Sequence, residues 1–387
     1  MIWAKKLTDI QPFYVMEVLR RAKELVAQGR DIVRLEVGEP NFSTPPPIIK
    51  AAHQALEKDQ TNYTLAQGSL PLRKRISKWY GEQYGVDVSE NRIIITSGTS
   101  GAFMLAFGII LDPGDRFAIT DPGYPCYKNM IRLLGGQPVQ IPVGPDSQYQ
   151  LNASLLAPEL KKGLRGGLIT SPSNPTGTLI NDTAFTQVVE LIEGGGGVVV
   201  SDEIYHGITY GKSAKTALEF SDKAIVINGF SKYFAMTGWR LGWMIVPHDA
   251  LGAVEMLQQN MFISASTIAQ HAALAAFDCT DNFANQLKKY DINRVYLIDS
   301  LQKLGFDISV EPMGAFYIYA NIANLLAKCD IENSQIFCER LLEEAGVAVT
   351  PGLDFGSFGA KEHLRFSYAT DFERIKEGVI RIAKFLE

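Results

Sequence analysis

Short apolar runs rich in β-branched residues alternate along the chain with helix-length amphipathic segments. Most of these runs are apolar at consecutive positions, which is typical of strands buried on both faces of a sheet. Strands are predicted at residues 92–96, 116–120, 138–142, 167–170, 197–201 and 224–228. The alternation predicts an α/β domain in which helices flank a mostly parallel sheet.

The pattern changes after this region. Residues 266–304 are strongly helical and predict one or two helices that leave the sheet domain. Strands are then predicted at 306–310 and 314–319, and helices at 334–345 and 372–386. We therefore predict a second, smaller α+β domain. The large domain is expected to span residues 46–284, and the small domain to combine residues 1–45 with residues 285–387.

Composition limits the partners. The chain has 387 residues, of which 46% are hydrophobic, enough to build a large core. A net charge of −5 and the lack of a basic run argue against nucleic-acid and membrane partners. The sequence has neither a signal-peptide pattern nor a stretch of about 18 apolar residues. We therefore expect a cytoplasmic protein.

Metal and disulfide chemistry are not indicated. The cysteines are far apart and form no CxxC pair, which argues against a zinc site and against a disulfide framework. They are Cys126, Cys279, Cys329 and Cys338. The five histidines also lack the spacing of metal ligands. No metal is therefore predicted.

Polar residues follow four of the predicted strands, at the end where open α/β sheets bind their ligands. Residues 97–100, SGTS, follow the first strand and can present backbone N–H groups and hydroxyls to an anion. The other strand-end residues are Asn174, Asp202, Tyr205 and Lys232. One site could receive all of these groups.

The stretch INGFSKYFAMTGWRLGW carries two charges, Lys232 and Arg240, among many aromatic side chains. A surface helix would carry more charges, so we predict that both are buried for a purpose. An anion cradle with Arg240 indicates a phosphate, and a lysine in apolar surroundings indicates an imine-forming amine. Asp202 at a strand end could pair with a cationic ring nitrogen. Together these groups predict a pyridoxal phosphate site.

Motifs along nearly the whole chain support this interpretation. They are LEVGEPNFSTP, TNYTLAQG, DPGYP, SPSNPTG, SDEIY, FSKYFAMTGWRLGW, MGAFY, PGLDFG and HLRFSYA. In their order and spacing the chain resembles the class I/II aminotransferases of the aspartate aminotransferase superfamily, fold type I. The resemblance implies an α/β fold with a large cofactor-binding domain, and pyridoxal 5′-phosphate as cofactor.

The resemblance also implies roles for the strand-end residues. Lys232 matches the lysine that holds the cofactor covalently and moves a proton as general acid and base. Asp202 matches the carboxylate that keeps the pyridine nitrogen protonated. Tyr205 and Asn174 match the pair that hydrogen-bonds the ring oxygen, and Tyr124 matches the aromatic residue that stacks on the ring. Lys232, Asp202 and Tyr205 are thus the expected catalytic residues.

Phosphate binding falls to a second group of residues in this resemblance. They are Gly98, Thr99, Ser100, Ser231 and Arg240. The family's usual hydroxyl three residues before the lysine is replaced here by Gly229, so one phosphate contact is missing. A backbone N–H or a water could substitute for it.

The remaining implied contacts concern the substrate and a second subunit. Arg365 matches the arginine that binds the substrate α-carboxylate in bidentate fashion, assisted by Gly38 and Asn174. Tyr63 matches a tyrosine that reaches the cofactor phosphate of the neighbouring subunit. The resemblance therefore implies a homodimer with shared active sites, acting on an amino acid and a 2-oxo acid.

Structural interpretations exist for several of these residues. Asp202 and Glu203 could cap a helix, and Tyr63 and Tyr124 could be ordinary core aromatics. Asn174 could simply begin a turn. Arg365 could form an interdomain salt bridge. For His206, close to Asp202 in the sequence, a structural role is favoured over a contribution to the site.

The reaction and substrate remain open at this point. The resemblance implies that the N-terminal segment closes over the substrate, where residues 13–16, FYVM, would present apolar surface. The expected activity is therefore transamination to 2-oxoglutarate from a neutral or apolar donor. An aspartate aminotransferase is the alternative, with Lys128 or a partner's cation in the pocket. A pyridoxal-phosphate-dependent C–S lyase would share nearly every residue. A cofactor-sensing regulator is disfavoured, because no basic DNA-binding segment is present.

Overall fold

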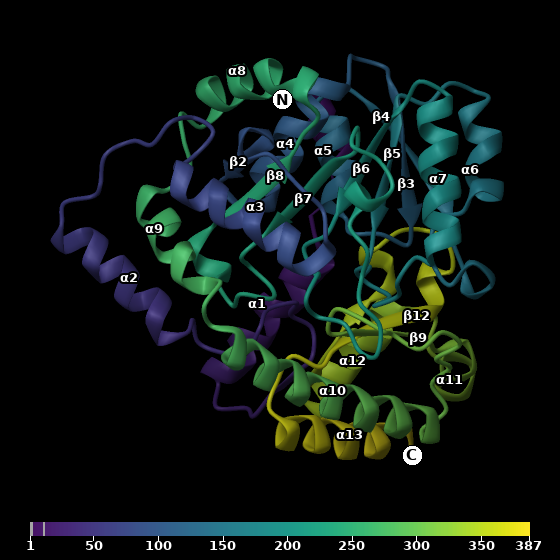
Figure 1. Cartoon of the computed structure of the whole chain (residues 1–387). Helices are drawn as coiled ribbons and strands as arrows, with labels where there is room; N and C mark the ends of the chain where they lie inside the picture. The colour runs from purple at the N-terminus through teal and green to yellow at the C-terminus, as the bar shows by residue number, and fades with distance from the viewer. Residues whose placement is uncertain (1–2, 11) are drawn as a thin grey trace.

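A seven-stranded sheet forms the centre of the computed structural model, which describes residues 3–10 and 12–387 (Figure 1). Its strand order is β2-β8-β7-β6-β5-β3-β4. The strands are β2 Ile93–Thr96, β3 Arg116–Asp121, β4 Gln137–Pro142, β5 Gly166–Thr170, β6 Val198–Asp202, β7 Ile225–Gly229 and β8 Gly242–Ile245. β8 runs antiparallel to both β2 and β7, whereas the other pairs are parallel. The predicted α/β class and the six predicted strands are confirmed.

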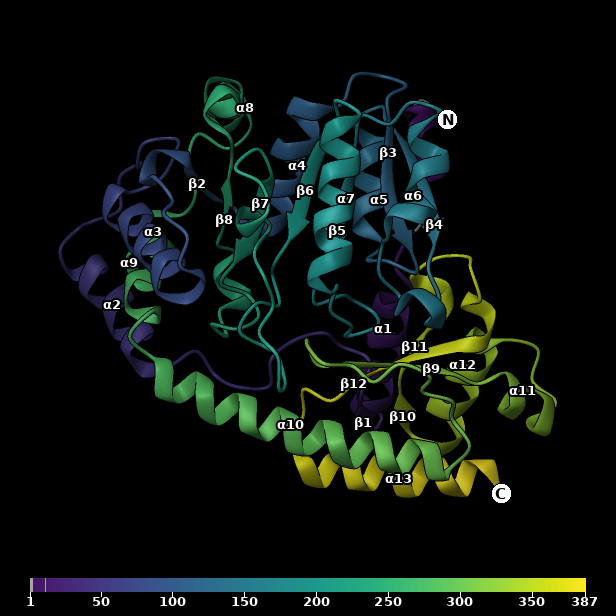
Figure 2. The same cartoon turned by 45° about the vertical axis from the view of Figure 1, so that its right-hand side comes forward.

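Helices cover both faces of this sheet (Figures 1 and 2). Because successive strand residues point to opposite faces, Val199 and Val226 pack in one buried cluster with α3, Leu70–Tyr84, and α7, Asp182–Gly194. Val200 and Ile227 pack in another with α4, Gly98–Ile110. This two-sided burial explains the consecutive apolar residues of the strands. The other helices of this part are α2 Pro46–Glu57, α5 Cys126–Leu133, α6 Ala153–Leu160, α8 Leu251–Met261 and α9 Thr267–Ala276.

The rest of the chain forms two small sheets with their own helices. The antiparallel order β11-β12-β9 joins Thr350–Pro351, His363–Ser367 and Tyr317–Asn321. A parallel pair joins β1, Val33–Arg34, to β10, Val347–Ala348, and so brings the N-terminal segment beside the C-terminal part. The helices here are α1 Tyr14–Ala27, α10 Thr280–Lys303, α11 Ala323–Cys329, α12 Ser334–Ala345 and α13 Phe372–Leu386. The domain limits 46–284 and 1–45 with 285–387 stay a prediction, and residues 1, 2 and 11 lie outside the described residues.

Several helix predictions hold in this part of the chain. Residues 266–304 form two helices, α9 and α10, and the latter runs beside α13 in Figure 2. The helices predicted at 334–345 and 372–386 are observed as α12 and α13. No helix in residues 3–10 and 12–387 is long and apolar enough to span a membrane.

Two strand predictions need correction. Residues 306–310 form no strand, because only an isolated bridge between Asp307 and Asn321 connects them to β9. The strand predicted at 314–319 begins later, at Tyr317. Gly314 instead packs against Pro172, whose Cγ would lie 2.5 Å from an added Cβ. The sequence analysis also missed β8, which begins at Gly242 within the aromatic stretch that contains Lys232.

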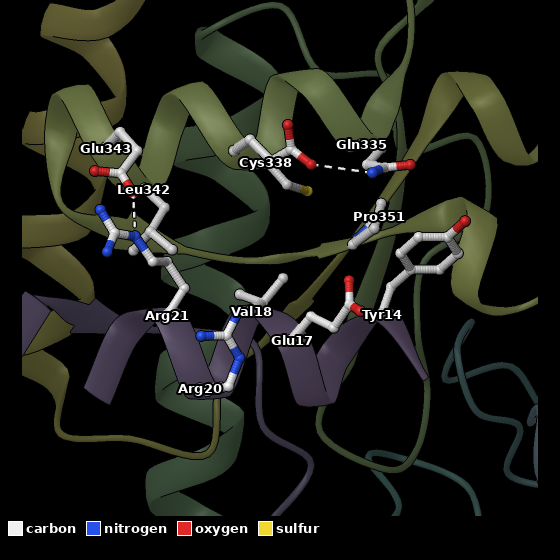
Figure 3. A pocket seen from close by; sticks show the side chains of 11 residues that line it. Tyr14, Glu17, Val18, Arg20, Arg21, Gln335, Cys338, Leu342, Glu343 and Pro351 are labelled. Atoms are coloured by element: carbon white, nitrogen blue, oxygen red, sulfur yellow. Dashed lines mark hydrogen bonds and ion pairs between the residues drawn. The ribbon is translucent and has the colours of Figure 1, made fainter. Parts of the chain in front are cut away.

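The N-terminal helix α1 is fixed against the C-terminal part of the chain. Its first N–H groups, from Tyr14 and Val15, donate to the Asp354 carboxylate at 2.8 and 3.4 Å. Further along, Arg21 Nε donates to Glu343 of α12 at 2.5 Å. A cavity of about 200 Å³ lies between the two helices (Figure 3). The apolar segment at the start of α1 is thus held by residues more than 300 positions away.

Candidate active site

The predicted site residues converge on one edge of the large sheet. β2, β5, β6 and β7 all run in the same direction, so their carboxyl ends share this edge. α4 begins there at Gly98, directly after β2. Asn174 follows β5, Asp202 ends β6, and Lys232 follows β7. The sheet topology therefore gathers residues that are up to 134 positions apart, counting from Gly98 to Lys232.

Lys232 is partly buried, and its Nζ donates a hydrogen bond of 2.7 Å to the Gly38 carbonyl. Burial lowers the pKa of this amine to about 8, against the opposing effect of Glu39, while Arg365 and Arg240 lower it further. A lysine with such a pKa is a better nucleophile at neutral pH than an ordinary one. Arg240, by contrast, is exposed in the single chain, so the prediction that both charges of this stretch are buried is wrong for Arg240.

Asp202 is 4% exposed at the end of β6. Its Oδ2 accepts a hydrogen bond from the Tyr127 hydroxyl, and its Oδ1 accepts one of 3.1 Å from the Ile204 N–H. Burial raises the pKa of Asp202 to about 6, although these hydrogen bonds and Lys232 favour the ionised form. A cationic N–H beside this carboxylate would offset the cost of its burial.

Arg365 lies on β12 between the rings of Tyr317 and Phe355, whose centroids are 4.4 and 4.7 Å from its guanidinium carbon. Its Nη1 donates to Asn174 Oδ1 at 2.9 Å, and its Nη2 donates to the Glu36 carbonyl at 2.6 Å. These contacts bring the predicted pair Arg365 and Asn174 together. The buried Nε has no hydrogen-bond partner, which leaves a donor for an anionic oxygen.

Gly38, Tyr205 and Tyr124 lie in the same region. A Cβ added to Gly38 would collide with the Tyr317 hydroxyl, so the close backbone approach requires glycine. That hydroxyl lies 2.7 Å from the hydroxyl of Tyr205. The ring of Tyr124 packs against Tyr127, with centroids 5.4 Å apart. The rings of these tyrosines surround the carboxyl ends of the strands.

The predicted anion site forms where Arg240 meets the start of α4. A Cβ added to Gly98 would lie 2.8 Å from Arg240 Nη2, so the guanidinium sits directly at the helix N-terminus. Gly98 has φ +70°, a conformation that favours glycine. The first N–H groups of α4, from Gly98, Thr99 and Ser100, together with the guanidinium, provide the donors that phosphate oxygens need. Ser231, which is 8% exposed, directly precedes Lys232.

Gly229 is explained by close packing. A Cβ there would lie 3.1 Å from Gly242 Cα, 3.2 Å from the Leu241 carbonyl oxygen and 3.2 Å from Thr99 Cγ2. Two of these three neighbours are backbone atoms of β8 or its entry, which cannot rotate away. The methyl group of Thr99 thus contacts the position that the missing side chain would occupy.

Tyr63 is not part of this cluster in the single chain, because its side chain is 79% exposed. Its loop is fixed to α9, where Thr267 Oγ1 donates to the Asn62 carbonyl at 2.6 Å. The sequence analysis also missed residues that complete the site, namely Tyr127, Tyr317, Thr350 and Phe355. Tyr127 could have been predicted from the sequence, because it lies three residues, about one helical turn, after Tyr124. Within the described ranges, no three His, Cys, Asp or Glu side chains gather to hold a metal ion.

Comparison with known proteins defines the family. The model for aminotransferase class I and II matches residues 30–382. The valine–pyruvate aminotransferase of Mycobacterium tuberculosis is 39% identical, over 97% of each chain. The (5-formylfuran-3-yl)methyl phosphate transaminase of Methanocaldococcus jannaschii is also 39% identical, over 99% of each chain. The structure of aspartate aminotransferase from Thermus thermophilus with maleate superposes with a TM-score of 0.93, at 30% identity and 99% coverage of each chain.

The chain therefore belongs to the class I and II aminotransferase family, with the fold type I architecture of aspartate aminotransferase. It is an aminotransferase, and enzymes of this family use pyridoxal 5′-phosphate. The residues of the strand-end cluster fit this cofactor. They supply an amine with a lowered pKa in Lys232, a buried carboxylate in Asp202, and an anion site between Arg240 and α4.

Introducing the family's usual hydroxyl at position 229 tests whether close packing explains the glycine there. We expect Gly229→Ser to lower the free energy of unfolding by about 1–3 kcal/mol, because it overfills a closely packed contact. It should also weaken cofactor binding by displacing Thr99, and an added Thr99→Ser change, which removes the methyl group, should recover part of both losses. Urea unfolding of the apo-protein and cofactor titration measure the two effects.

Gly238→Ser is the matched control, because a Cβ at this exposed glycine meets nothing within 4 Å. Its stability and cofactor affinity should equal those of the unmodified protein. If Gly229→Ser were as stable as this control and bound the cofactor more tightly, the packing account would be wrong.

Proposed function

We propose that this aminotransferase transfers an amino group from a neutral or apolar L-amino acid to a 2-oxo acid, with pyridoxal phosphate bound to Lys232. The single observation that carries the proposal is the convergence of Lys232, Asp202 and the Arg365–Asn174 pair at one sheet edge. The bound cofactor supplies an electron sink for the bond electrons of the substrate Cα. The protein supplies binding, orientation and proton transfer.

Lys232 has two tasks in this proposal. Its lowered pKa makes the amine available as a nucleophile for the cofactor aldehyde. Once released by the incoming amino acid, the same Nζ would take the proton from the substrate Cα and return it to the cofactor carbon that had carried the aldehyde. An amine with a pKa of about 8 is well matched to taking up and releasing a proton near neutral pH.

Asp202 and Tyr205 orient the ring in this proposal. Asp202 would hold the proton on the pyridine nitrogen, and the hydrogen bonds from Tyr127 and Ile204 fix the orientation of its carboxylate. Tyr205 and Asn174 hydrogen-bond the ring oxygen. Tyr124 stacks on the ring face, supported by its contact with Tyr127.

Arg365 binds the substrate α-carboxylate. Its guanidinium is held by Asn174, Glu36 and Thr350, and it is confined between two rings, so little side-chain freedom is lost when a substrate binds. Its Nε–H has no partner within the protein, so we expect this donor to form its hydrogen bond only with the substrate. Both the amino acid and the 2-oxo acid carry this carboxylate, so one arginine serves both half-reactions.

The surroundings of the side-chain pocket support a neutral donor. Phe13 packs against Tyr124, with ring centroids 6.2 Å apart, at the segment that Asp354 holds in place. Burial and Arg132 lower the pKa of the partly buried Lys128, whereas the carboxylates of Asp121 and Asp354 oppose this shift, so the amine already has two anionic neighbours. The 39% identity with a valine–pyruvate aminotransferase, against 30% with the aspartate aminotransferase structure, also supports this choice.

The first test concerns Lys232. Borohydride reduction of the protein with its cofactor should fix the cofactor on this residue, as peptide mapping will reveal. Lys232→Ala should lose both the adduct and transamination, whereas Lys223→Ala, which changes an exposed lysine before β7, should lose neither. An adduct on a different lysine would refute the assignment.

The rate of adduct formation in the apo-protein gives a pH test of the same group. Because only the neutral amine attacks, the rate should rise with pH and level off above about 8, the pKa of Lys232. An ordinary lysine would continue to gain reactivity up to about pH 10.4. Continued increase beyond pH 9 would show that Lys232 is not perturbed.

The donor test compares kcat/KM for valine, alanine, methionine, phenylalanine and aspartate, with 2-oxoglutarate as the proposed acceptor and pyruvate as the comparison. Neutral donors should be favoured, because an unpaired distal carboxylate in a closed site is unfavourable by at least a few kcal/mol. Aspartate exceeding every neutral donor by about tenfold would refute the apolar pocket. If Lys128→Met then selectively lost the activity with aspartate, Lys128 would be identified as the cation that binds the distal carboxylate. Pyruvate release without any acceptor would indicate elimination instead.

We also propose a homodimer with shared sites. Exposed apolar side chains lie on the loop that contains Tyr63, on α8, and on the residues that follow α8. They are Tyr63, Leu65, Met256, Met261 and Ile263. A 3.5 Å contact between Gln67 and Glu255 connects the loop to α8. A second copy of the chain would cover this surface, and two-fold association is the commonest form of oligomer.

Subunit mixing tests this arrangement. Lys232→Ala and Tyr63→Phe should each have low activity alone. After exchange in equal amounts, hybrid dimers with one intact site should restore about a quarter of the wild-type sites if Tyr63 acts in trans. Verified exchange without recovery would contradict shared sites.

A further inference from the structure

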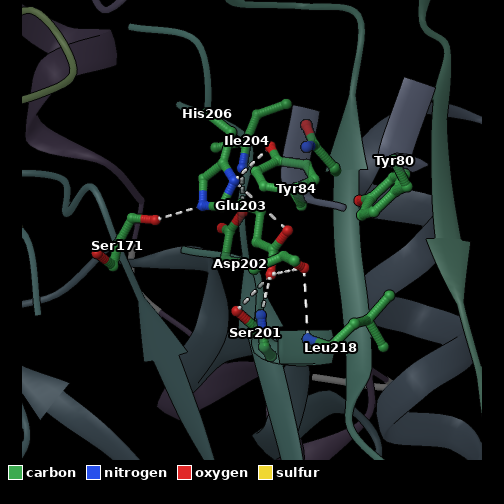
Figure 4. A network of polar contacts seen from close by, with 12 residues as sticks. Tyr80, Tyr84, Ser171, Ser201, Asp202, Glu203, Ile204, His206 and Leu218 are labelled. Atoms are coloured by element: carbon green, nitrogen blue, oxygen red, sulfur yellow. Dashed lines mark hydrogen bonds and ion pairs between the residues drawn. The ribbon is translucent and has the colours of Figure 1, made fainter. Parts of the chain in front are cut away.

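A buried polar network lies directly behind Asp202, on the other side of the β6 strand end (Figure 4). Glu203 and His206 belong to it, and they are 0% and 2% exposed. Neither has a role in the proposed reaction. Burying two ionisable side chains is unfavourable unless hydrogen bonds satisfy them, so their partners indicate what they do.

The two ring nitrogens of His206 have different partners. Nε2 lies 2.9 Å from the Ser171 carbonyl oxygen, and Nδ1 lies 2.8 Å from the Tyr84 hydroxyl. A carbonyl oxygen can only accept, so Nε2 must carry the hydrogen. The Tyr84 hydroxyl then donates to Nδ1. The Ser171 carbonyl thus selects the Nε2–H tautomer of the neutral imidazole.

Glu203 does not form an ion pair with this histidine. Its Oε1 accepts hydrogen bonds from Ser201, Thr216 and the Ala217 N–H, at 2.8 to 3.1 Å. Its Oε2 lies 3.5 Å from His206 Nδ1 and has no hydrogen-bond partner. Burial raises the pKa of Glu203 to about 8 and lowers that of His206 to about 3, so it favours the neutral form of both groups.

Ser171 connects this network to the substrate side of the site. It follows β5 and begins the loop SPSNPTG, in which Asn174 comes three residues later. Within the loop, the Ser171 hydroxyl accepts from the Ile180 N–H at 3.1 Å, and the Gly177 N–H donates to the Ser173 carbonyl at 2.8 Å. The hydrogen bond from His206 therefore fixes the entry of a tightly bonded loop that carries Asn174.

We propose that His206 is a positioning residue, which in the Nε2–H tautomer set by the Ser171 carbonyl connects the strand end of Asp202 and Tyr205 to the loop of Asn174. This proposal rests on the proposed function for the roles of these three residues. One imidazole ring thereby fixes the distance between the group that orients the cofactor ring and the amide that contacts Arg365. A histidine that merely filled space would need no defined tautomer.

The tautomer itself is the first test and requires no variant. In apo-protein labelled with ¹⁵N-histidine, the five histidines give separate signals, and the His206 signal is assigned by its loss in His206→Gln. We expect a neutral ring with hydrogen on Nε2 between pH 6 and pH 8. Tyr84→Phe, which keeps the ring and removes the hydroxyl, should disturb this signal. A wild-type ring with hydrogen on Nδ1, or a charged ring, would overturn the proposal.

The second test compares two substitutions of similar size in the holoenzyme. His206→Gln keeps a donor near the Nε2 position, whereas His206→Asn keeps only a polar group near Nδ1 and cannot reach Ser171. We expect KM for the amino acid to rise about tenfold in His206→Asn and to recover in His206→Gln. Equal KM values in the two variants would overturn the proposal.

Thermal unfolding of both apo-proteins separates positioning from stability. Similar unfolding midpoints, with KM differing between the variants, support the positioning role; a KM difference that follows a lower midpoint in His206→Asn overturns it. The NMR result is independent of catalysis. If Lys232 carried no cofactor but the Nε2–H tautomer were found, the proposed function would fail while the geometry of His206 would stand.

Discussion

Desolvation of charged side chains at the carboxyl edge of the large sheet is the constraint on which the active site depends. Burial lowers the pKa of Lys232 and raises that of Asp202, and in both cases it is the largest effect. The hydrogen bonds to Asp202 reduce this effect without cancelling it. Asp202 is therefore held in a state that a cationic partner would stabilise, and the family's cofactor offers one in its ring nitrogen, while Lys232 is held as an amine able to react with the cofactor aldehyde.

The sequence predicted the centre of the fold well because the signal there is local. Strands buried on both faces must be apolar at consecutive positions, and Val199 and Val200 demonstrate this by packing on opposite faces. β8 was missed because its four residues overlap the end of a long aromatic stretch and have no separate periodicity. Residues 306–310 have the composition of a strand, but only one bridge, at Asp307, pairs them, and pairing is not visible in the sequence.

The residues of the candidate site, too, could be predicted only where the sequence signal is local. Lys232, Asp202, Asn174 and Arg365 were found from motifs, and the structure brings them to one edge, although their roles stay predictions. Residues that act through contacts between distant segments could not be found in this way. Thr350, for example, binds both Arg365 and the Glu36 carbonyl, a set of contacts across more than 300 residues. The presence of glycine at position 229 also could be explained only from the structure, which places the methyl group of Thr99 beside it.

The reversed direction of β8 has a consequence for the path of the chain. After β7 ends at Gly229, the chain is at the carboxyl edge of the sheet, and it enters β8 at Gly242 from that same edge, where the two glycines pair. The intervening segment never has to cross the sheet. A parallel β8 would require a crossover to the opposite edge, which would carry part of this segment away. The antiparallel return keeps Lys232 and Arg240 at the same edge of the sheet, so a single connection carries both the amine and the cation that the proposed cofactor site needs.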